Sequence, residues 1–219
     1  MRRRSASRLR ACDVTDEMKP RMIGSEMQSD FESSLDDALQ SLAAMRQLQH
    51  GLRDAASKCI DSLSQGHKLI ACGNGGSACQ AQHLAGELVG RYKSNRAALP
   101  ALALTADSAV LTCIGNDYAF EDIFARQIRA LGQPGDVLVA FSTSGRSANV
   151  LRALEACREL QITSIAFLGQ DGGAAAPLAD CALIVPHTDT ARVQEGHLFL
   201  MHSLMDLIEA AIAHGMERR

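Results

Sequence analysis

The sequence predicts an α/β protein in which a parallel sheet of five strands lies between two layers of helices. The first observation is five short apolar runs, each separated from the next by a stretch long enough to hold a helix or a helical turn. The second is that two segments with apolar residues at helical spacing precede the first run. Apolar runs that alternate with helical segments are typical of parallel strands covered on both faces, as in a three-layer sandwich.

The two opening segments are the first predicted elements. Apolar residues recur at helical spacing over residues 31–45, and again over residues 52–63 after Gly51. We therefore expect two amphipathic helices ahead of the sheet.

The apolar runs then predict the remaining elements. Each run is continuous rather than spaced, which is typical of a buried strand. The predicted strands cover residues 69–72, 101–104, 137–141, 164–168 and 182–185. The predicted helices cover residues 76–90, 119–131, 147–160 and 190–214, with shorter turns at 107–115 and 173–178.

Length and composition predict the domain organisation. The chain has 219 residues, 47% of them hydrophobic, which is enough for one domain with a substantial core. The first residues are rich in arginine, contain few large apolar residues and show no clear period. We therefore expect a flexible N-terminal extension over residues 1–26 and a single domain over residues 27–219.

Composition also argues against two classes of partner. The formal net charge is -3, which predicts no extended basic surface for nucleic acid. Tryptophan is absent, and there are only two tyrosines and six phenylalanines, so few aromatic rings are available to stack on bases. No apolar run reaches the roughly 20 residues of a membrane span, and the N-terminus lacks the apolar region of a signal peptide. We expect a cytoplasmic protein that binds neither nucleic acid nor membranes.

The seven cysteines are widely spaced and include no C-x-x-C pair. This pattern fits neither a disulfide framework nor a thiolate zinc site. We expect reduced thiols, most of them buried.

Three polar loops follow predicted strands, at residues 73–77, 105–107 and 142–147. Ligands of open parallel sheets bind beyond the carboxyl ends of the strands, where the strand order reverses. We therefore look for ligand-binding residues in these loops.

The segment FSTSGRSAN, residues 141–149, carries four hydroxyl groups and a glycine between a strand and a helix. Hydroxyls and free backbone N–H groups at the start of a helix can converge on an anion, which the helix dipole also favours. The pattern indicates a phosphate site formed by Ser142, Thr143, Ser144 and Ser147. An ordinary serine-rich turn in which Ser147 caps the helix is the alternative.

The segment GNGGS, residues 73–77, stands at an equivalent strand-to-helix turn. Because glycine has no side chain, a ligand can approach this backbone closely. The segment matches neither G-x-x-x-x-G-K-[ST] nor G-x-G-x-x-G. We therefore expect a small phosphorylated ligand rather than a nucleotide.

On the helix that follows, His83 and Glu87 are four residues apart and share one face. They are close enough to bind one cation or to act together on a substrate. A glutamate near a sugar carbonyl can also serve as a general base if burial raises its pKa. The alternative is a solvated polar stripe, and this helix alone does not decide between them.

The last predicted helix contains the segment RVQEGHLFLMHSLMDLIE, with polar residues at Gln194, Glu195, His197 and His202. An isolated helical histidine is more often structural than a ligand. His202, however, lies in an otherwise apolar stretch, where a polar ring needs a partner.

Four segments together resemble the sugar isomerase (SIS) domain family, and within it the bacterial phosphoheptose isomerases. They are GNGGSACQAQHLAGELVGRY, GNDYAFEDIFARQ, GDVLVAFSTSGRSAN and RVQEGHLFLMH. The resemblance runs over residues 27–214 and implies a flavodoxin- or Rossmann-like fold with N-terminal helices used for oligomerisation. It also implies a homotetramer whose active sites are shared between subunits.

The activity implied by the resemblance is the isomerisation of D-sedoheptulose 7-phosphate to D-glycero-D-manno-heptose 7-phosphate. This is the first step toward the heptose of lipopolysaccharide or another surface glycan. Such a reaction passes through an enediol or enediolate, and it needs a base, an acid and a group that holds the oxyanion. Glu87 matches the catalytic glutamate of the family and His202 its catalytic histidine, so we expect Glu87 to transfer the carbon-bound proton and His202 to serve the oxygens.

The resemblance further implies a set of binding residues. Those that contact the sugar phosphate correspond to Asn74, Gly75, Gly76, Glu87, Asn116, Asp117, Ser142, Thr143, Ser144, Ser147 and Gln194. The zinc ligands of metal-bound members correspond to His83, Glu87, Gln194 and His202, with one zinc ion expected per subunit.

Two points of this assignment conflict with simple geometry or chemistry. Gln194 and His202 are eight residues apart, a rise of about 12 Å on an ideal helix. Both reach one ion only if Gln194 lies at the start of the helix or if different subunits contribute. A zinc ion bound to Glu87 would also lower the basicity of its carboxylate, so the roles of ligand and base compete.

Two other functions fit the same family. A noncatalytic SIS-domain protein that binds the bacterial replication initiator lacks the matching glutamate and last histidine, whereas Glu87 and His202 are present here. A sugar-phosphate-sensing regulatory domain is usually joined to a DNA-binding segment, and residues 1–26 are too short and unpatterned for one. The sequence therefore favours the enzyme.

Overall fold

The computed structural model describes residues 25–216. The chain divides into two compact units, and their boundary lies inside the first helix, between Leu35 and Asp36. The described part of the first unit is helical throughout. The extension expected over residues 1–26 lies outside the described residues, apart from its last two, which begin this helix.

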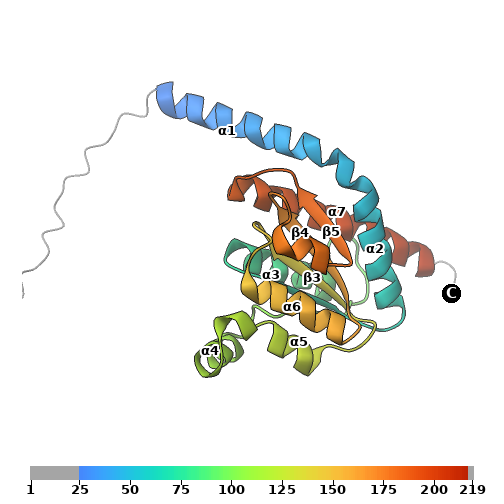
Figure 1. Ribbon diagram of the computed structural model, residues 1–219. Helices are drawn as coiled ribbons and strands as arrows, with labels where there is room; N and C mark the ends of the chain where they lie inside the picture. The colour runs from blue at the N-terminus through green and yellow to red at the C-terminus, as the bar shows by residue number, and fades with distance from the viewer. Residues whose placement is uncertain (1–24, 217–219) are drawn as a thin grey trace, which may run out of the picture. The chain divides into compact units, whose positions relative to one another are not determined.

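Two helices precede the sheet, as expected (Figure 1). Helix α1 spans Ser25–Ala44, helix α2 spans Gln49–Ser64, and the short 3-10 helix η1, Met45–Leu48, joins them. Gly51 lies inside α2 rather than between the two helices. A Cβ at this position would stand 2.9 Å from the Leu183 side chain in the sheet, so the glycine allows α2 to pack closely there.

Five parallel strands form one sheet in the order β2-β1-β3-β4-β5. All five predicted strands are confirmed, at Leu69–Gly73 (β1), Ala101–Ala103 (β2), Val137–Ser142 (β3), Thr163–Gly169 (β4) and Cys181–Val185 (β5). The order reverses between β1 and β3, because the chain passes from β1 to the edge strand β2 and then returns to the other side of β1. Gly73 and Phe141 are register partners, so the carboxyl ends of β1 and β3 lie together.

The predicted crossover helices and the last helix are confirmed. They are α3 (Gly76–Val89), α6 (Ala148–Glu159) and α7 (Thr190–Met216). The turn expected after β4 is the 3-10 helix η3, Gly173–Leu178.

The segment after β2 forms a full helix, α4 (Ser108–Asp117), where only a short turn was expected. Asp107 caps it, because its carboxylate accepts hydrogen bonds from the N–H groups of Ala109 and Val110 at 3.0 Å. An aspartate followed by several apolar residues is a recognisable helix start, so the sequence did contain this information.

The single helix expected over residues 119–131 is wrong. The structure has the 3-10 helix η2, Phe120–Asp122, followed by the short helix α5, Ala125–Leu131. In one continuous α-helix Phe120 and Phe124 would share a face. The break allows Phe124 to be 1% exposed while Phe120 is 61% exposed.

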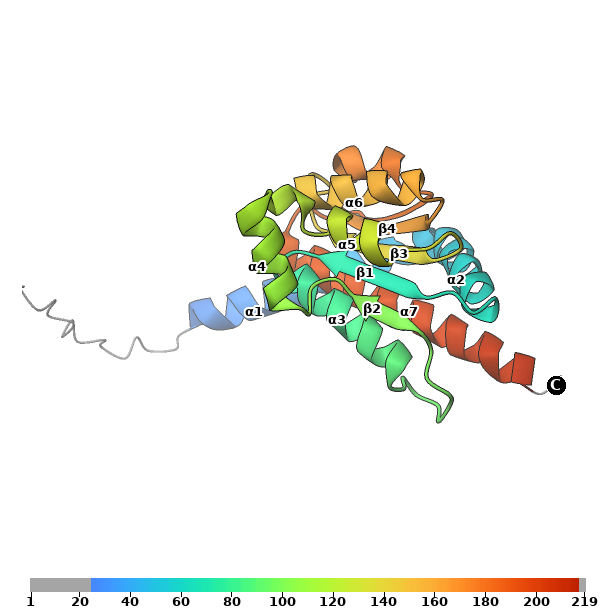
Figure 2. The same ribbon diagram turned by 90° about the horizontal axis from the view of Figure 1, so that it is seen from below.

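Alternate residues of the strands face two separate apolar cores. Val137, Val139 and Phe141 of β3 pack with residues of α2, α3 and α7, whereas Leu138 and Ala140 pack with residues of α4, α5 and α6. Figure 2 shows these two helical layers on opposite faces of the sheet. The predicted three-layer α/β sandwich is therefore confirmed.

Helix α7 contains a stretch, Thr190–Ala213, that is long and apolar enough to cross a membrane by length and composition alone. Its residues Leu200, Leu204 and Ile208 are instead part of the apolar core on one face of the sheet. Such a stretch is also typical of the core helix of a soluble protein.

The six described cysteines form no disulfide, and Cys59, Cys72, Cys157 and Cys181 are buried. Burial raises the pKa of Cys59 and of Cys157 to about 12. The expectation of buried thiols holds for this part of the chain, and Cys12 lies outside the described residues.

Candidate active site

Two of the three predicted loops meet where the strand order reverses. The glycine loop, residues 73–77, follows β1, and the hydroxyl loop, residues 142–147, follows the neighbouring strand β3. In doubly wound sheets this crevice is where ligands bind. The third loop, residues 105–107, follows the edge strand β2 and ends in Asp107, which caps α4.

A pair of side-chain amides joins the glycine loop to the start of α6. Asn74 Nδ2 donates to Asn149 Oδ1 and Asn149 Nδ2 donates to Asn74 Oδ1, both at 2.8 Å. Asn149 is 2% exposed, so water does not compete for these bonds. The pair holds the glycine loop and the hydroxyl loop at a set spacing.

The glycine loop turns the chain from β1 into α3. Gly75 has a φ of 56°, which residues with a side chain rarely adopt. At Gly76 a Cβ would lie 2.5 Å from Nε2 of Gln194, so the glycine lets this amide lie against the start of α3. Gln80 holds Gln194 there by donating to its backbone carbonyl at 2.7 Å. An open backbone at a helix N-terminus is suited to an anionic ligand.

The hydroxyl loop presents side chains at the N-terminus of α6. Ser142 Oγ accepts a hydrogen bond from the Gly145 N–H at 3.1 Å, and Ser144 Oγ accepts one from the Arg146 N–H at 3.2 Å. Ser147 occupies the N-cap position of α6, but its side chain makes no capping hydrogen bond. The alternative in which the Ser147 hydroxyl only caps the helix is therefore wrong, and this hydroxyl can serve an anion.

Arg146, which the sequence did not single out, forms an exposed ion pair between the hydroxyl loop and the segment after β4. Its guanidinium donates to both carboxylate oxygens of Asp171 at 2.8 and 2.7 Å, and to Gln170 Oε1 at 3.2 Å. The hydrogen bonds from Arg146 are the main reason that the pKa of Asp171 is lowered. The loop is thereby attached to the segment that follows β4.

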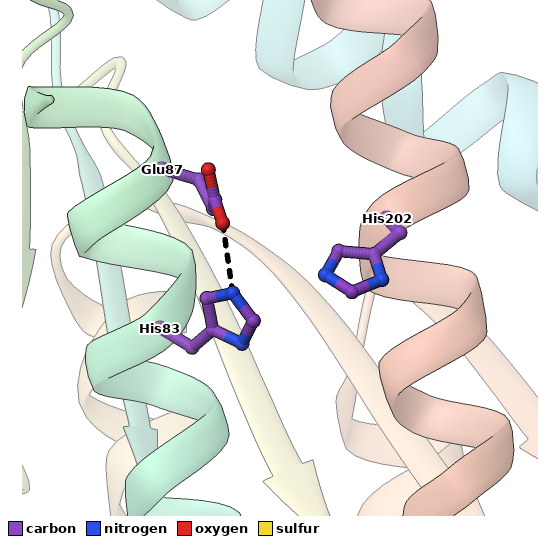
Figure 3. Close-up of side chains that lie close together, drawn as sticks. All are labelled: His83, Glu87 and His202. Carbon is purple, nitrogen blue, oxygen red and sulfur yellow. Dashed lines mark hydrogen bonds and ion pairs between the residues drawn. The ribbon is translucent and has the colours of Figure 1, made fainter. Parts of the chain in front are cut away.

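His83, Glu87 and His202 meet between α3 and α7 (Figure 3). His83 Nε2 lies 2.8 Å from Glu87 Oε1. The ring centroids of His83 and His202 are 5.2 Å apart, with the rings nearly perpendicular. The Glu87 side chain is only 19% exposed. The His83 side chain is 41% exposed, so the polar stripe on α3 is partly solvated and also contributes two side chains to this cluster.

Tyr92, which follows α3, was also not anticipated. Its ring stacks on the ring of His202, with centroids 5.6 Å apart and an angle of 20° between the planes. Together with His83 it supplies the partners that a polar ring in the apolar stretch of α7 requires.

The donor set of this cluster fits a divalent metal ion. Two imidazoles and one carboxylate are a common set at catalytic zinc sites, where a fourth position remains for water or substrate. One ligand atom from each of the three residues lies within 4.8 Å of the others. The ligands of a tetrahedral zinc ion are about 3.4 Å apart, so small side-chain rotations bring these atoms into range.

Gln194 lies with the glycine loop rather than with this cluster. Helix α7 is continuous from Thr190 to Met216, so Gln194 and His202 are separated by a rise of about 12 Å. The Gln194 amide lies against Gly76, the first residue of α3, whereas His83 lies about two turns further along that helix.

Asn116 and Asp117 end α4 and are exposed. Asn116 Nδ2 donates to Asp117 Oδ1 at 2.7 Å, and Cys113 Sγ lies 3.4 Å from Asp117 Oδ2. Within residues 25–216, no hydrogen bond joins them to either loop. The structure therefore does not bring these two predicted residues together with the rest of the site.

Comparison with known proteins defines the family. The SIS domain pattern matches residues 33–169. A phosphoheptose isomerase from Trichlorobacter lovleyi is 46% identical over 187 residues, which cover 85% of this chain and 95% of that protein. The chain belongs to the phosphoheptose isomerases of the SIS domain family.

Other phosphoheptose isomerases match over similar lengths. One from Helicobacter pylori is 44% identical, over 88% of this chain and 99% of that protein. The solved structure of one from Neisseria gonorrhoeae has a TM-score of 0.80 and 41% identity, over 84% of this chain and 99% of that chain. These matches confirm the resemblance drawn from the sequence and do not favour the noncatalytic alternative.

The SIS domain match contains both loops, His83 and Glu87, but it ends at Gly169. Helix α7, with Gln194 and His202, follows this region. The resemblance of the segment RVQEGHLFLMH predicted that His202 acts with Glu87, and the tertiary structure brings the two side chains together.

Proposed function

We propose that the protein isomerises D-sedoheptulose 7-phosphate to D-glycero-D-manno-heptose 7-phosphate. The observation that carries the proposal is the meeting of Glu87 on α3, the helix that follows the glycine loop, with His202 on α7, far away in the sequence. Relatives that match over nearly their whole length are named for this reaction, which supports it. The reaction would supply the first intermediate for heptose units of lipopolysaccharide or another surface glycan.

The hydroxyl loop is our candidate for the phosphate. Its members are Ser142, Thr143, Ser144 and Ser147, and the free hydroxyl of Ser147 at the N-terminus of α6 supports this assignment. The backbone of Gly75 and Gly76 and the amide of Gln194 would contact the sugar. Asn74 would act mainly through its backbone, because Asn149 already engages its side-chain oxygen and one amide hydrogen.

Glu87 and His202 would carry the proton transfers. The Glu87 carboxylate removes a proton from C1 of the ketose, and the C1–H electrons form the C1–C2 double bond of an enediolate. His202 protonates the oxygen on C2 and accepts the proton from the hydroxyl on C1. Glu87 then returns its proton to C2, which leaves the carbonyl at C1 and completes the aldose.

We propose that His83, Glu87 and His202 hold zinc, with one ion per subunit, while Gln194 has the least support as a ligand. The two imidazoles and the carboxylate support this choice of metal. When bound, such an ion would supply Lewis-acid polarisation of the carbonyl and stabilisation of negative charge on its oxygen. Since metal binding lowers the basicity of a carboxylate and occupies an imidazole nitrogen, the metal would compete with both proton-transfer roles, and we assign Glu87 primarily as the base and His202 primarily as its acid–base partner.

A homotetramer with shared active sites is also proposed. A groove of about 700 Å³ runs between the C-terminal part of α1, η1, α2 and α7, and it is lined mainly by apolar side chains, including Leu39, Leu42 and Phe199. Leu39 and Phe199 are 55% and 53% exposed. Phe199 lies one turn before His202 on α7, so a second copy in this groove would approach the active site. Asn116 and Asp117 are exposed at the end of α4, in the helical layer opposite this groove, so they would reach a shared site only through a different copy.

We further propose that the protein acts in the cytoplasm, since its proposed substrate is a phosphorylated sugar. The net charge of -3 gives no support to a nucleic-acid partner.

The test is an NMR assay of the purified protein with sedoheptulose 7-phosphate, with zinc added or removed by a chelator. We expect new signals of an aldoheptose phosphate. In Glu87→Gln we expect kcat to fall by about 10²- to 10⁴-fold, since the general base is lost, while calorimetry still detects binding of the sugar phosphate. Glu155→Gln, which changes an exposed glutamate on α6, is the matched control and should leave kcat unchanged.

A folded wild-type protein that produces no aldoheptose phosphate under either metal condition would contradict the proposed reaction. Normal turnover by Glu87→Gln would contradict only the assignment of the base.

A further inference from the structure

A buried ion pair joins the segment after α3 to α7, the two helices that carry the candidate catalytic residues. The proposed mechanism does not use either residue of this pair. Arg96 Nε lies 3.2 Å from Glu209 Oε1, and the two side chains are only 5% and 7% exposed. Arg96 belongs to the connecting segment, residues 90–100, which leads from α3 to β2, and Glu209 belongs to α7. Buried charges are costly unless hydrogen bonds satisfy them fully.

The Glu209 carboxylate is satisfied by the backbone of the connecting segment. The N–H groups of Tyr92, Lys93 and Ser94 donate to it at 3.3, 3.2 and 3.0 Å. Burial raises the pKa of Glu209, but these hydrogen bonds lower it by more, so that its pKa lies below the ordinary value. The carboxylate therefore stays ionised and binds the segment to α7.

The Arg96 guanidinium is satisfied by the end of α3. Its Nη2 donates to the backbone carbonyl of Glu87 at 2.5 Å, and its Nη1 donates to that of Leu88 at 2.8 Å. Carbonyls in the last turn of a helix lack partners within the helix, and a cation there is favoured by the helix dipole. Arg96 thus caps α3 at the residue whose side chain is the candidate base.

The same segment also contacts His202. Glu209 follows His202 by seven residues, about two turns of α7, so both project from one side of this helix. Tyr92 donates its N–H to Glu209 while its ring stacks on His202. The segment therefore contacts α7 at Glu209 and at His202, and it contacts the end of α3 through Arg96.

We propose that the Arg96–Glu209 pair is a positioning device that sets the distance between Glu87 on α3 and His202 on α7. The path from the Glu87 carbonyl to α7 runs through the Arg96 and Glu209 side chains, which are only 5% and 7% exposed. The inference rests on the proposed function, because that function places the two proton-transferring groups on these helices. A misplacement of catalytic groups by 1 Å can reduce a rate by about 100-fold.

The chain offers a matched control. Lys93 and Asp206 form a second ion pair between the same segment and the same helix, but their side chains are 63% and 49% exposed. Solvent screens such a pair, and exposed pairs hold their partners weakly. Asp206→Asn should therefore leave both the geometry and the activity of the site unchanged.

The first measurement compares the kinetics of Glu209→Gln and Asp206→Asn with those of the wild type, at a temperature where all three are folded by circular dichroism. We expect Glu209→Gln to lower kcat by about 10- to 100-fold, because Glu87 and His202 lose their alignment. The KM for sedoheptulose 7-phosphate should stay close to that of the wild type, because the glycine and hydroxyl loops are untouched.

The second measurement does not depend on turnover. In proton NMR of protein labelled at its seven histidines, the ring signal of His202 should shift in Glu209→Gln, because the stacked Tyr92 ring moves. His197 is on the same helix as His202, but its ring lies between Phe141 and Phe167 of the sheet. Its signal should not shift. Arg96→Lys keeps the positive charge, but a lysine cannot reach Glu209 and both backbone carbonyls at once. We therefore expect this variant to show the same loss of kcat and the same shift of the His202 signal. It replaces Glu209→Gln as the test if Glu209→Gln does not fold.

Wild-type kcat together with an unmoved His202 signal in the folded variants would overturn the positioning role and leave the pair only a part in stability. An increase of KM alone would overturn it as well. If the wild-type protein itself lacks isomerase activity, the proposed function is wrong. The NMR signal of His202 then decides by itself whether the Arg96–Glu209 pair positions His202.

Discussion

At the scale of single residues, two histidines of α7 show how little their spacing reveals about their roles. His202 is partly exposed and borders His83 and Tyr92. His197, five residues earlier, is fully buried, and its ring centroid lies 6.1 Å from those of Phe141 and Phe167. Neither ring nitrogen of His197 makes a well-formed hydrogen bond with the described residues. His197 is therefore a residue of the core, as most isolated helical histidines are.

The burial of His197 predicts a pH dependence of stability. Burial lowers the pKa of its ring to about 4, and contact with the Leu168 backbone offsets this only in part. The unfolded chain binds a proton near the ordinary pKa of about 6.5, so the free energy of unfolding falls as the pH drops from about 6.5 to about 4. We expect a loss of about 2 kcal/mol between pH 7 and pH 5 from this residue, measured by urea unfolding.

The comparison variant is His197→Phe, in which no proton can bind, so that this part of the pH dependence should disappear. His50→Gln changes an exposed histidine of α2 and should retain the wild-type dependence. An unaltered pH dependence in His197→Phe would show that other groups cause it.

At the scale of elements, the site depends on contacts between loops that follow different strands. The end of the glycine loop, Ser77, and the start of the hydroxyl loop, Ser142, are 65 positions apart in the sequence, yet the parallel register of β1 and β3 brings the two loops together. The reciprocal amide bonds of Asn74 and Asn149 then set their spacing. We infer that this pair contributes to phosphate binding without touching the reacting carbons.

Asn149→Ala tests this inference. The loops lose both hydrogen bonds, and we expect KM for the sugar phosphate to rise roughly tenfold, the effect of about 1.4 kcal/mol of lost binding, with kcat changed less. Asn74→Ala combined with Asn149→Ala should cost no more than either change alone, because both remove the same interaction.

Asn95→Ala, at an exposed position of the connecting segment, is the control for loss of an asparagine side chain. Additive effects of the two substitutions on KM would show that Asn74 and Asn149 act separately.

At the scale of the whole molecule, the apolar groove beside α7 is the feature that a single chain leaves unexplained. Exposed apolar surface of this kind commonly marks a contact between proteins. The groove carries Leu39, Leu42 and Phe199, and Phe199 precedes His202 by one turn. Assembly and catalysis are therefore expected to depend on each other.

Light scattering of the purified protein should give a mass four times that of the chain. Leu39→Glu and Phe199→Glu place a charge in the groove, so we expect smaller species and a loss of kcat, because the shared sites are opened. Leu131→Glu changes a leucine of α5 that is 48% exposed in the opposite helical layer, and it should preserve both mass and activity. A fully active monomer would contradict the shared-site assembly.

Much of the fold follows from local sequence. The five apolar runs predict the strands because a strand buried on both faces needs continuous apolar residues. The two loops were predictable from the segments GNGGS and FSTSGRSAN. Their glycines allow a tight turn, and their hydroxyl groups are suited to bind an anion. Local spacing failed at residues 119–131, where burial of Phe124 without Phe120 interrupts the helix.

The sequence by itself determined the three-layer class of fold, the positions of the glycine and hydroxyl loops and the placement of His83 and Glu87 on one face of a helix, since each depends on local sequence patterns. The family resemblance predicted that His202 acts with Glu87 and His83, whereas only the tertiary structure showed how these side chains meet, that Gln194 lies against Gly76, and that Arg96 and Glu209 connect α3 to α7. These contacts join residues that are far apart along the chain. Strand order and the packing of helices on the sheet bring such residues together, and no local pattern records them.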